Sequence, residues 1–223
     1  DPQGNASTAL GIDHYSDVTS IYDVLIDDVP MRDAVAQAPD FETLVCVPAT
    51  IDLAGAEIEL VSLVARENRL RNAIREHLEE REAQGLPRLD YVLVDCPPTL
   101  SALTRMAWAA SHKVLSVAEP SLFSVAGTKR TMSALAQFES SRIWAVPEAG
   151  VVINRVRNAS QEQQHRLREL RDLFGPLVVD PVLPDLPVVQ QAQGAAWPVH
   201  RWPGAEAAEI AGRFTAVLEG LTR

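Results

Sequence analysis

Short apolar runs alternate with longer segments of helical spacing along this chain, and that alternation restricts the fold more than any other feature. Each run is continuous rather than alternately apolar and polar, which is typical of strands covered on both faces of a sheet. Alternating strands and helices predict a doubly wound α/β fold, with a mostly parallel sheet and helices on both faces. The predicted strands are Leu44–Val47, Tyr91–Val94, Val114–Val117, Val151–Ile153 and Leu177–Val179.

Helical periodicity is clearest between residues 53 and 82, where Leu70, Ile74 and Leu78 recur at four-residue spacing. Farther on, Ser160 and Gln163 form a capping-box pattern, and the Gly-Pro pair after Phe174 ends the segment that follows. The predicted helices are Leu53–Glu82, Gln161–Phe174 and Ala205–Leu221.

The chain has 223 residues, 47% of them hydrophobic, which is enough for one core, so we expect one domain over residues 1–223. It has no apolar run long enough for a transmembrane helix, which needs about 18 residues. Cys46 and Cys96 lie in apolar runs and are predicted to be buried, reduced thiols of a cytoplasmic protein. Because the chain opens on Asp1, within a loop-like stretch, we expect an N-terminally truncated domain.

The formal net charge of −10 is unevenly distributed. Residues 1–118 hold nine Lys and Arg against 19 Asp and Glu, whereas residues 119–223 hold 11 of each. A protein that binds nucleic acid with its whole surface is usually basic. Any DNA contact is therefore predicted to come from a local patch in the second half.

Two stretches carry possible site chemistry by residue type alone. Asp95 follows an apolar run and precedes two prolines. In an open α/β sheet, ligands bind beyond the carboxyl ends of strands, where a carboxylate can hold magnesium; the alternative is that Asp95 only caps the next helix. Residues 1–8, DPQGNAST, suit either a loop that wraps a ligand or an ordinary surface turn.

The motifs DPQGNAST, GID, SIYDVL, VPATIDLAGAEIELV, YVLVDCPPTLSALT, EPSLFSVAGTKRT, GVVINRVRN and LPDLPVVQQAQGAAWPV follow one another along the chain. In order and spacing they resemble the ParA family of partition ATPases, which are deviant P-loop NTPases, over nearly the whole sequence. The resemblance implies a doubly wound α/β fold in which ATP, bound with Mg²⁺ at the carboxyl edge of the sheet, drives homodimerisation.

The resemblance also assigns roles to individual residues. Asp1 matches the switch I aspartate that positions the attacking water, and Asp95 matches the Walker B aspartate near Mg²⁺. Asn154 matches a position that reads the adenine edge, and Pro184 belongs to the loop that closes over the base. An amide suits the adenine edge because it both donates and accepts hydrogen bonds.

Departures from the family pattern concern the phosphates and the neighbouring loops. No Gly-x-x-x-x-Gly-Lys-Ser/Thr sequence occurs in the 223 residues. The family's phosphate loop is expected about thirty residues upstream of Asp1, judging from a strand–helix–strand unit. We therefore expect this fragment to be inactive as an ATPase. Ser101 stands where the family usually has Gly, Met106 where it has Asn, and Asp185 where many members carry a basic residue.

The resemblance further implies nonspecific DNA binding, a ParB-type partner, a cytoplasmic, nucleoid-associated location and no membrane contact. The stretch from Arg155 to Arg171 has a local charge of +3, and it contains the candidate DNA-binding residues Arg157, Arg166, Arg168 and Arg171. The alternative is a solvated helix with i, i+4 ion pairs, Glu162 with Arg166 and Arg168 with Asp172. Lys129 and Arg130 form a smaller candidate patch. An acidic segment, Glu76 to Glu82, is either a ParB-facing surface or a solvated face.

Two other functions stay open at this point. A MinD-like ATPase that positions another cargo would need a basic, lipid-binding C-terminal helix, but residues 205–223 carry two Arg against three Glu. A binding module without a P-loop and without enzymatic activity is the other alternative.

Overall fold

The computed structural model describes residues 1–15, 17–39, 41–140, 148–157 and 159–221. Its contacts divide the chain into two compact units, Asp1–Ser111 and His112–Arg223. This division does not test the prediction of one domain over residues 1–223, which stays a prediction. No helix within the described ranges is both long enough and apolar enough to cross a membrane.

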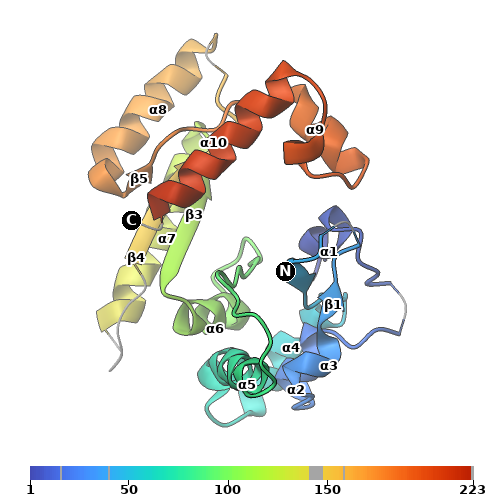
Figure 1. Ribbon diagram of the computed structural model, residues 1–223. Coiled ribbons are helices and arrows are strands. Elements are labelled where there is room, and N and C mark those ends of the chain that lie inside the picture. The colour runs from blue at the N-terminus through green and yellow to red at the C-terminus, as the bar shows by residue number, and fades with distance from the viewer. Residues whose placement is uncertain (16, 40, 141–147, 158, 222–223) are drawn as a thin grey trace. The chain divides into compact units, whose positions relative to one another are not determined.

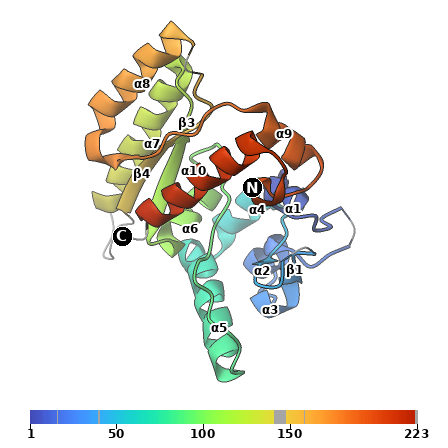
Figure 2. The same cartoon turned by 45° about the horizontal axis from the view of Figure 1, so that its top comes forward.

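The second unit is a parallel sheet between two helical layers (Figure 1). Its strands lie in the order β3-β4-β5, and β4 is central. Figure 2 shows α7 and α8 side by side on one face, whereas α10 covers the other face. The elements are β3 (Lys113–Ala118), α7 (Leu122–Ser140), β4 (Glu148–Ile153), α8 (Gln161–Phe174), η3 (Gly175–Leu177), β5 (Val178–Val179), α9 (Pro187–Gly194), η4 (Val199–Arg201) and α10 (Ala205–Leu221).

Two apolar clusters hold these three layers together. Because successive side chains of a strand point to opposite faces, Val151 and Ile153 of β4 join the cluster that contains Leu170 of α8. Val152, between them, joins the cluster that contains Ile210 of α10. The central strand is therefore buried on both faces, as its continuous apolar sequence predicts.

The strand β3 differs from that prediction. It pairs with β4 on one side, and no described strand pairs with its other side. Leu115 and Val117 are 40% and 64% exposed, so a continuous apolar run here forms a strand with an open face. The apolar sequence predicted the strand correctly and its burial wrongly.

The first unit is mainly helical. Its core gathers Leu25, Leu53, Leu60, Leu70 and Met106 from different helices. Its elements are α1 (Asn5–Ala9), α2 (Ile21–Ile26), α3 (Met31–Ala34), β1 (Ala36–Gln37), β2 (Val45–Cys46), α4 (Leu53–Glu59), η1 (Leu60–Ser62), η2 (Arg66–Asn68), α5 (Arg69–Ala83) and α6 (Ala102–Ala110).

Three predictions for this unit need correction. Residues 91–94 form no strand; they are exposed, and within the described part of the chain no strand lies beside them to accept their backbone hydrogen bonds. The predicted strand at 44–47 is reduced to β2, which pairs antiparallel with β1. The predicted helix over 53–82 is interrupted between Leu60 and Asn68, where Ala65 has a φ of 52°, a value that a right-handed helix excludes.

The other predicted elements are confirmed. The helices over 161–174 and 205–221 have the predicted bounds, and β3, β4 and β5 contain or overlap the predicted strands. At the start of α8, the hydroxyl of Ser160 accepts from the main-chain nitrogen of Gln163 at 3.3 Å, as the capping pattern predicts. In a capping box the Gln163 side chain would also accept from the Ser160 nitrogen. Here Gln163 Oε1 instead accepts from the nitrogen of Arg157 at 2.6 Å.

Candidate functional site

The first unit brings its three chemistry-bearing segments together. The N-terminal ammonium group of Asp1 donates to the carbonyl oxygen of Asp95 at 2.9 Å, across 94 positions of the sequence. The nitrogen of Ala49, in the loop before α4, donates to the hydroxyl of Ser7 at 3.4 Å. The segments 1–8, 45–50 and 91–98 therefore meet in one cluster of loops.

A tight turn at residues 1–4 presents the Asp1 side chain. The Asp1 carboxylate accepts from the nitrogen of Gln3 at 3.1 Å, and the Asp1 carbonyl accepts from the nitrogen of Gly4 at 3.1 Å. Gly4 has a φ of 62°, in the left-handed region. It lies so close to His14 and Ala49 that a Cβ here would stand 2.5 Å from His14 Cδ2 and 2.9 Å from the Ala49 oxygen. Only glycine fits this position.

We expect Gly4→Ala to destabilise the first unit by about 1–2 kcal/mol from the backbone conformation alone, and further through the contact with the Ala49 oxygen. Thermal unfolding followed by circular dichroism measures the effect. Gly55→Ala is the matched control, since the new methyl group of that helical residue meets only Glu59, at 3.7 Å. The control should be neutral or stabilising, and equal losses in the two variants would contradict the role of Gly4.

The Asp95 carboxylate has the properties of a magnesium ligand. It is exposed, and among the described residues it makes no hydrogen bond or ion pair. A carboxylate oxygen is the ligand type that Mg²⁺ prefers in proteins, commonly with water completing the shell. The neighbouring Cys96 thiol is half-buried, and burial raises its pKa, so at neutral pH it is an uncharged thiol. Asp95 therefore fits Mg²⁺, and Cys96 does not add a ligand.

The second unit places Asn154 and Pro184 at one edge of its sheet. Asn154 follows the last residue of β4, and its nitrogen donates to the Ala118 oxygen at 2.8 Å. Val156 and Pro184 form a parallel bridge, and the nitrogen of Val156 donates to the Leu183 oxygen at 3.0 Å. The carboxyl end of β4 and the loop before α9 are thereby held side by side.

The amide of Asn154 is partly engaged. Its Oδ1 accepts from the nitrogen of Arg155 at 2.9 Å, which suits the left-handed conformation of Arg155, with a φ of 56°. No described group bonds to Nδ2, and the residue is half-buried. Asn154 thus retains the two N–H donors of Nδ2 and one lone pair of Oδ1 for a ligand.

Three of the four candidate DNA-binding arginines lie on α8, and two of these, Arg166 and Arg168, differ in their surroundings. Arg166 binds Glu162 at 2.7 Å and Glu169 at 2.8 Å, and its side chain is only 18% exposed. The hydrogen bond from Arg166 lowers the pKa of Glu169. Arg168 is exposed and makes no ion pair within the described residues, so the predicted pairing with Asp172 is not seen. The predicted Glu162–Arg166 pair is confirmed.

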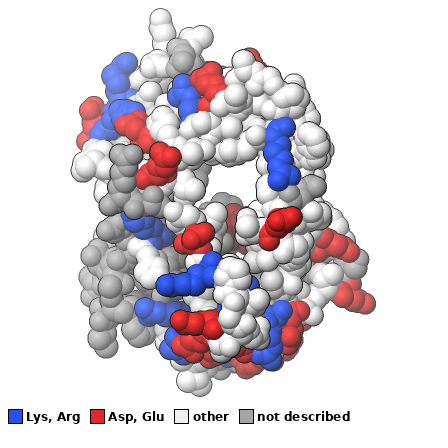
Figure 3. Space-filling model, in the orientation of Figure 1, with Lys and Arg blue, Asp and Glu red and all other residues white. Residues whose placement is uncertain are grey.

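Arg157 and Arg171 pair with carboxylates that follow α8 in the chain. Arg157 Nε donates to Asp185 at 2.6 Å, and Arg171 donates to both carboxylate oxygens of Asp180, at 3.1 and 2.6 Å. The hydrogen bonds from Arg171 lower the pKa of Asp180. Figure 3 shows the result, with basic and acidic side chains interspersed over α8 in the upper left of the view. The net charge of +3 between Arg155 and Arg171 therefore does not form a uniform basic patch.

Asp185 and Asp180 are the partners that sequence reasoning missed. Counting i, i+4 neighbours finds only pairs within one helix, and these two residues lie in the loops after α8. Asp185 is also one of the departures from the family pattern. A carboxylate at that position could have indicated an ion pair with the arginines that follow β4.

Comparison with known proteins places this arrangement in a family. A family model described as an AAA domain matches residues 1–143. The chain is 34% identical to the chromosome partitioning protein ParA of Caulobacter vibrioides over 199 residues, which are 89% of this chain and 72% of that protein. It superposes on Cyanothece McdA, solved as an ATP complex, with a TM-score of 0.83 and 19% identity, covering 99% of this chain and 82% of that chain.

A second solved structure carries a nucleotide and a metal ion. This is cobyrinic acid a,c-diamide synthase from Mycobacterium smegmatis with bound ADP and magnesium. It matches with a TM-score of 0.71 and 25% identity, covering 87% of this chain and 74% of that one.

Proposed function

The chain belongs to the ParA-type family of partition ATPases, and from this we propose that it serves an ATP-dependent partition reaction that segregates chromosomal or plasmid DNA. The observation that supports the proposal best is the convergence of residues 1–8, 45–50 and 91–98 in the first unit, joined by the 2.9 Å bond between Asp1 and Asp95. The convergence supports the proposal because Asp1 and Asp95, to which the family assigns water positioning and metal binding, lie in adjoining loops.

Each candidate residue has a proposed task. Asp1 orients the attacking water, a role that suits phosphoryl transfer because this reaction depends more on an in-line nucleophile than on a strong base. Asp95 holds Mg²⁺, which when bound supplies positive charge beside the phosphates. Asn154 offers its amide to the adenine edge, and Pro184 closes over the base from the adjoining loop.

DNA and protein partners belong to the same proposal. The nucleotide-bound protein is a homodimer at the nucleoid, and it binds duplex DNA through backbone phosphates without sequence preference. A ParB-type partner meets the acidic side of α5 with a basic segment. Glu76 and Glu82 are the carboxylates proposed to face it, since Glu79 lies 3.8 Å from Arg75 and Glu80 is paired with Arg32.

Arg168 is the residue expected to contribute most to DNA binding, because it is exposed and makes no ion pair with a described residue. In a chimaera that carries a ParA-family phosphate loop upstream of Asp1, we expect Arg168→Ala to weaken ATP-dependent duplex binding. The slope of log affinity against log salt should fall by about one, because one phosphate contact is lost. Gel-shift titrations at several salt concentrations measure both quantities.

Arg166→Ala is the matched control on the same helix. Since Glu162 and Glu169 hold Arg166 and its side chain is 18% exposed, this substitution should change affinity and salt slope much less. Arg157 and Arg171 should give intermediate effects, because each must leave a carboxylate to reach a phosphate. An Arg166→Ala effect as large as that of Arg168→Ala would contradict the assignment. If none of the four variants alters binding, the DNA surface lies elsewhere, with Lys129 and Arg130 tested next.

A further inference from the structure

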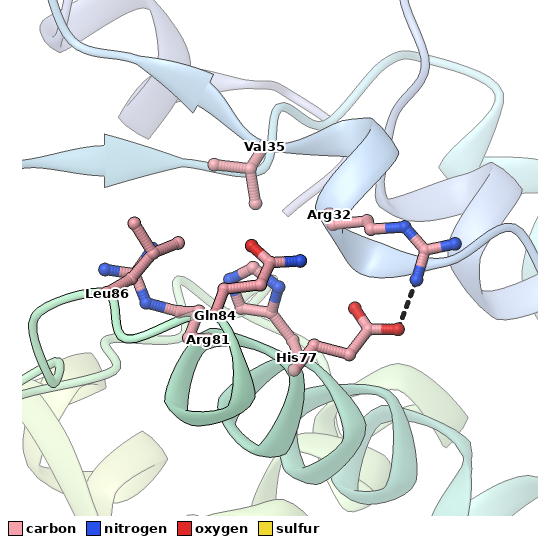
Figure 4. Close-up of a pocket in the computed structure, with 7 residues that line it drawn as sticks. Arg32, Val35, His77, Arg81, Gln84 and Leu86 are labelled. Atoms are coloured by element: carbon pink, nitrogen blue, oxygen red, sulfur yellow. Dashed lines mark hydrogen bonds and ion pairs between the residues drawn. The ribbon is translucent and has the colours of Figure 1, made fainter.

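A cavity of about 240 Å³ lies within the first unit, away from the Asp1–Asp95 cluster. Figure 4 shows side chains from α3, from the C-terminal half of α5 and from the residues just after each helix gathered around it, with Arg32 joined to Glu80 on one side. The cavity is smaller than most sites for drug-sized ligands, which occupy roughly 300–1,000 Å³, and it suits a small ion or molecule. Its lining residues are Arg32, Val35, His77, Glu80, Arg81, Gln84 and Leu86.

The cavity contains buried polar atoms without partners. His77 is 8% exposed, and neither of its ring nitrogens forms a hydrogen bond with a described residue. Arg81 Nε is also buried and unbonded. A buried polar atom left unsatisfied costs about 1–3 kcal/mol, so unsatisfied donors on two side chains beside one cavity point to a group that is bound there.

The charges around the cavity favour an anion. Glu80, the carboxylate of the lining, is engaged by Arg32. Arg81 makes no ion pair in the described part of the chain, and its Nη2 donates only to the carbonyl of Pro87, at 2.8 Å. Burial and, next, the charge of Arg81 lower the pKa of His77, so its ring is neutral at pH 7. The free donors are therefore Arg81 Nε–H and one N–H of a neutral imidazole.

We propose that this cavity is a binding site for a small oxyanion, which accepts hydrogen bonds from Arg81 Nε and from the His77 ring. An oxyanion satisfies both donors at once and balances the charge of Arg81, whereas water satisfies the donors and leaves the charge unbalanced. The site is separate from the residues proposed for ATP and DNA, and although Glu76 and Glu82 lie on the same helix, its occupancy can be measured without nucleotide, DNA or a protein partner.

The test is a titration of the 223-residue chain with inorganic phosphate at constant ionic strength, in a chloride background, with acetate as a second arm. The ring nitrogen signals of His77, assigned by their loss in His77→Gln, report on the site by NMR. We expect these signals to shift with saturation. The arm that saturates at lower concentration identifies the anion as a phosphate-like or a carboxylate group.

Variants of two arginines on α5 separate specific binding from general charge effects. Arg81→Gln should weaken phosphate binding at least about 10-fold, because one charged hydrogen bond is lost. Arg75→Gln, which removes an exposed arginine outside the cavity, should change it less than about twofold. If Arg81→Gln does not fold, Arg81→Lys keeps the charge without the planar donor and should still weaken binding. No saturation in either arm, or equal losses in the Arg75 and Arg81 variants, would overturn the proposal.

Discussion

Replacing Asp1 with alanine is expected to slow ATP turnover about 100-fold or more, in a chimaera that carries a ParA-family phosphate loop upstream of Asp1. Nucleotide affinity should stay close to that of the unsubstituted chimaera. The expectation follows from the proposed division of tasks, in which Asp1 orients water and other groups hold the nucleotide. The donor to the Asp95 carbonyl is the Asp1 nitrogen, an ammonium group in this chain and an amide in the chimaera, and the substitution removes neither form of it. Steady-state turnover and equilibrium titration with Mg-ATP measure the two quantities separately.

Asp17→Ala is the control for Asp1→Ala. Asp17 is an exposed carboxylate of the same unit, and it makes no hydrogen bond or ion pair among the described residues. Its removal changes the net charge equally and should leave turnover unchanged. A parallel loss of turnover and affinity in the Asp1 variant would mean that Asp1 maintains the loop structure rather than positioning water.

The second large effect concerns nucleotide binding by residues 1–223 themselves. No Gly-x-x-x-x-Gly-Lys-Ser/Thr sequence occurs among them, so these residues lack the amides and lysine that neutralise the β- and γ-phosphates in such sites. We expect no saturable binding of Mg-ATP below about 1 mM, which corresponds to less than about 4 kcal/mol of binding free energy. Isothermal titration calorimetry is the measurement, and the phosphate-loop chimaera is the positive control.

Micromolar binding of Mg-ATP by residues 1–223 would contradict this expectation. It would mean that residues 1–223 hold the nucleotide without a phosphate loop. Binding by neither protein would instead indicate that the chimaera is misassembled, which a comparison of their unfolding transitions reveals.

The sequence predicted the second unit better than the first. The bounds of α8 and α10 follow from capping residues and amphipathic spacing, which are local signals. The segment 91–94 has an equally strong apolar sequence, yet a strand also needs a hydrogen-bonded neighbour, and sequence alone does not reveal whether one is present. The break at Ala65 was missed because alanine carries no signal for a positive φ.

The sequence likewise predicted some features of the candidate sites and missed others. The motifs led to Asp1 and Asp95, and to Asn154 and Pro184, and the structure brings the members of each pair into neighbouring loops. Their roles stay predictions. The pairing of Arg157 and Arg171 with carboxylates beyond α8 depends on how the following loops fold back. The cavity at His77 was not predicted either, because a histidine on a charged helix gives no indication of what packs over it.

The open edge of β3 has a practical consequence for work with this chain. Unpaired N–H and C=O groups along an exposed strand can add a strand from another molecule. Proteins commonly guard such edges with charges, but Lys113 is the only charged residue in Lys113–Ala118, and it lies at the first position. The exposed side chains of Leu115 and Val117 provide an apolar surface for such an added strand. Purification at low protein concentration and refolding by rapid dilution should therefore limit aggregation.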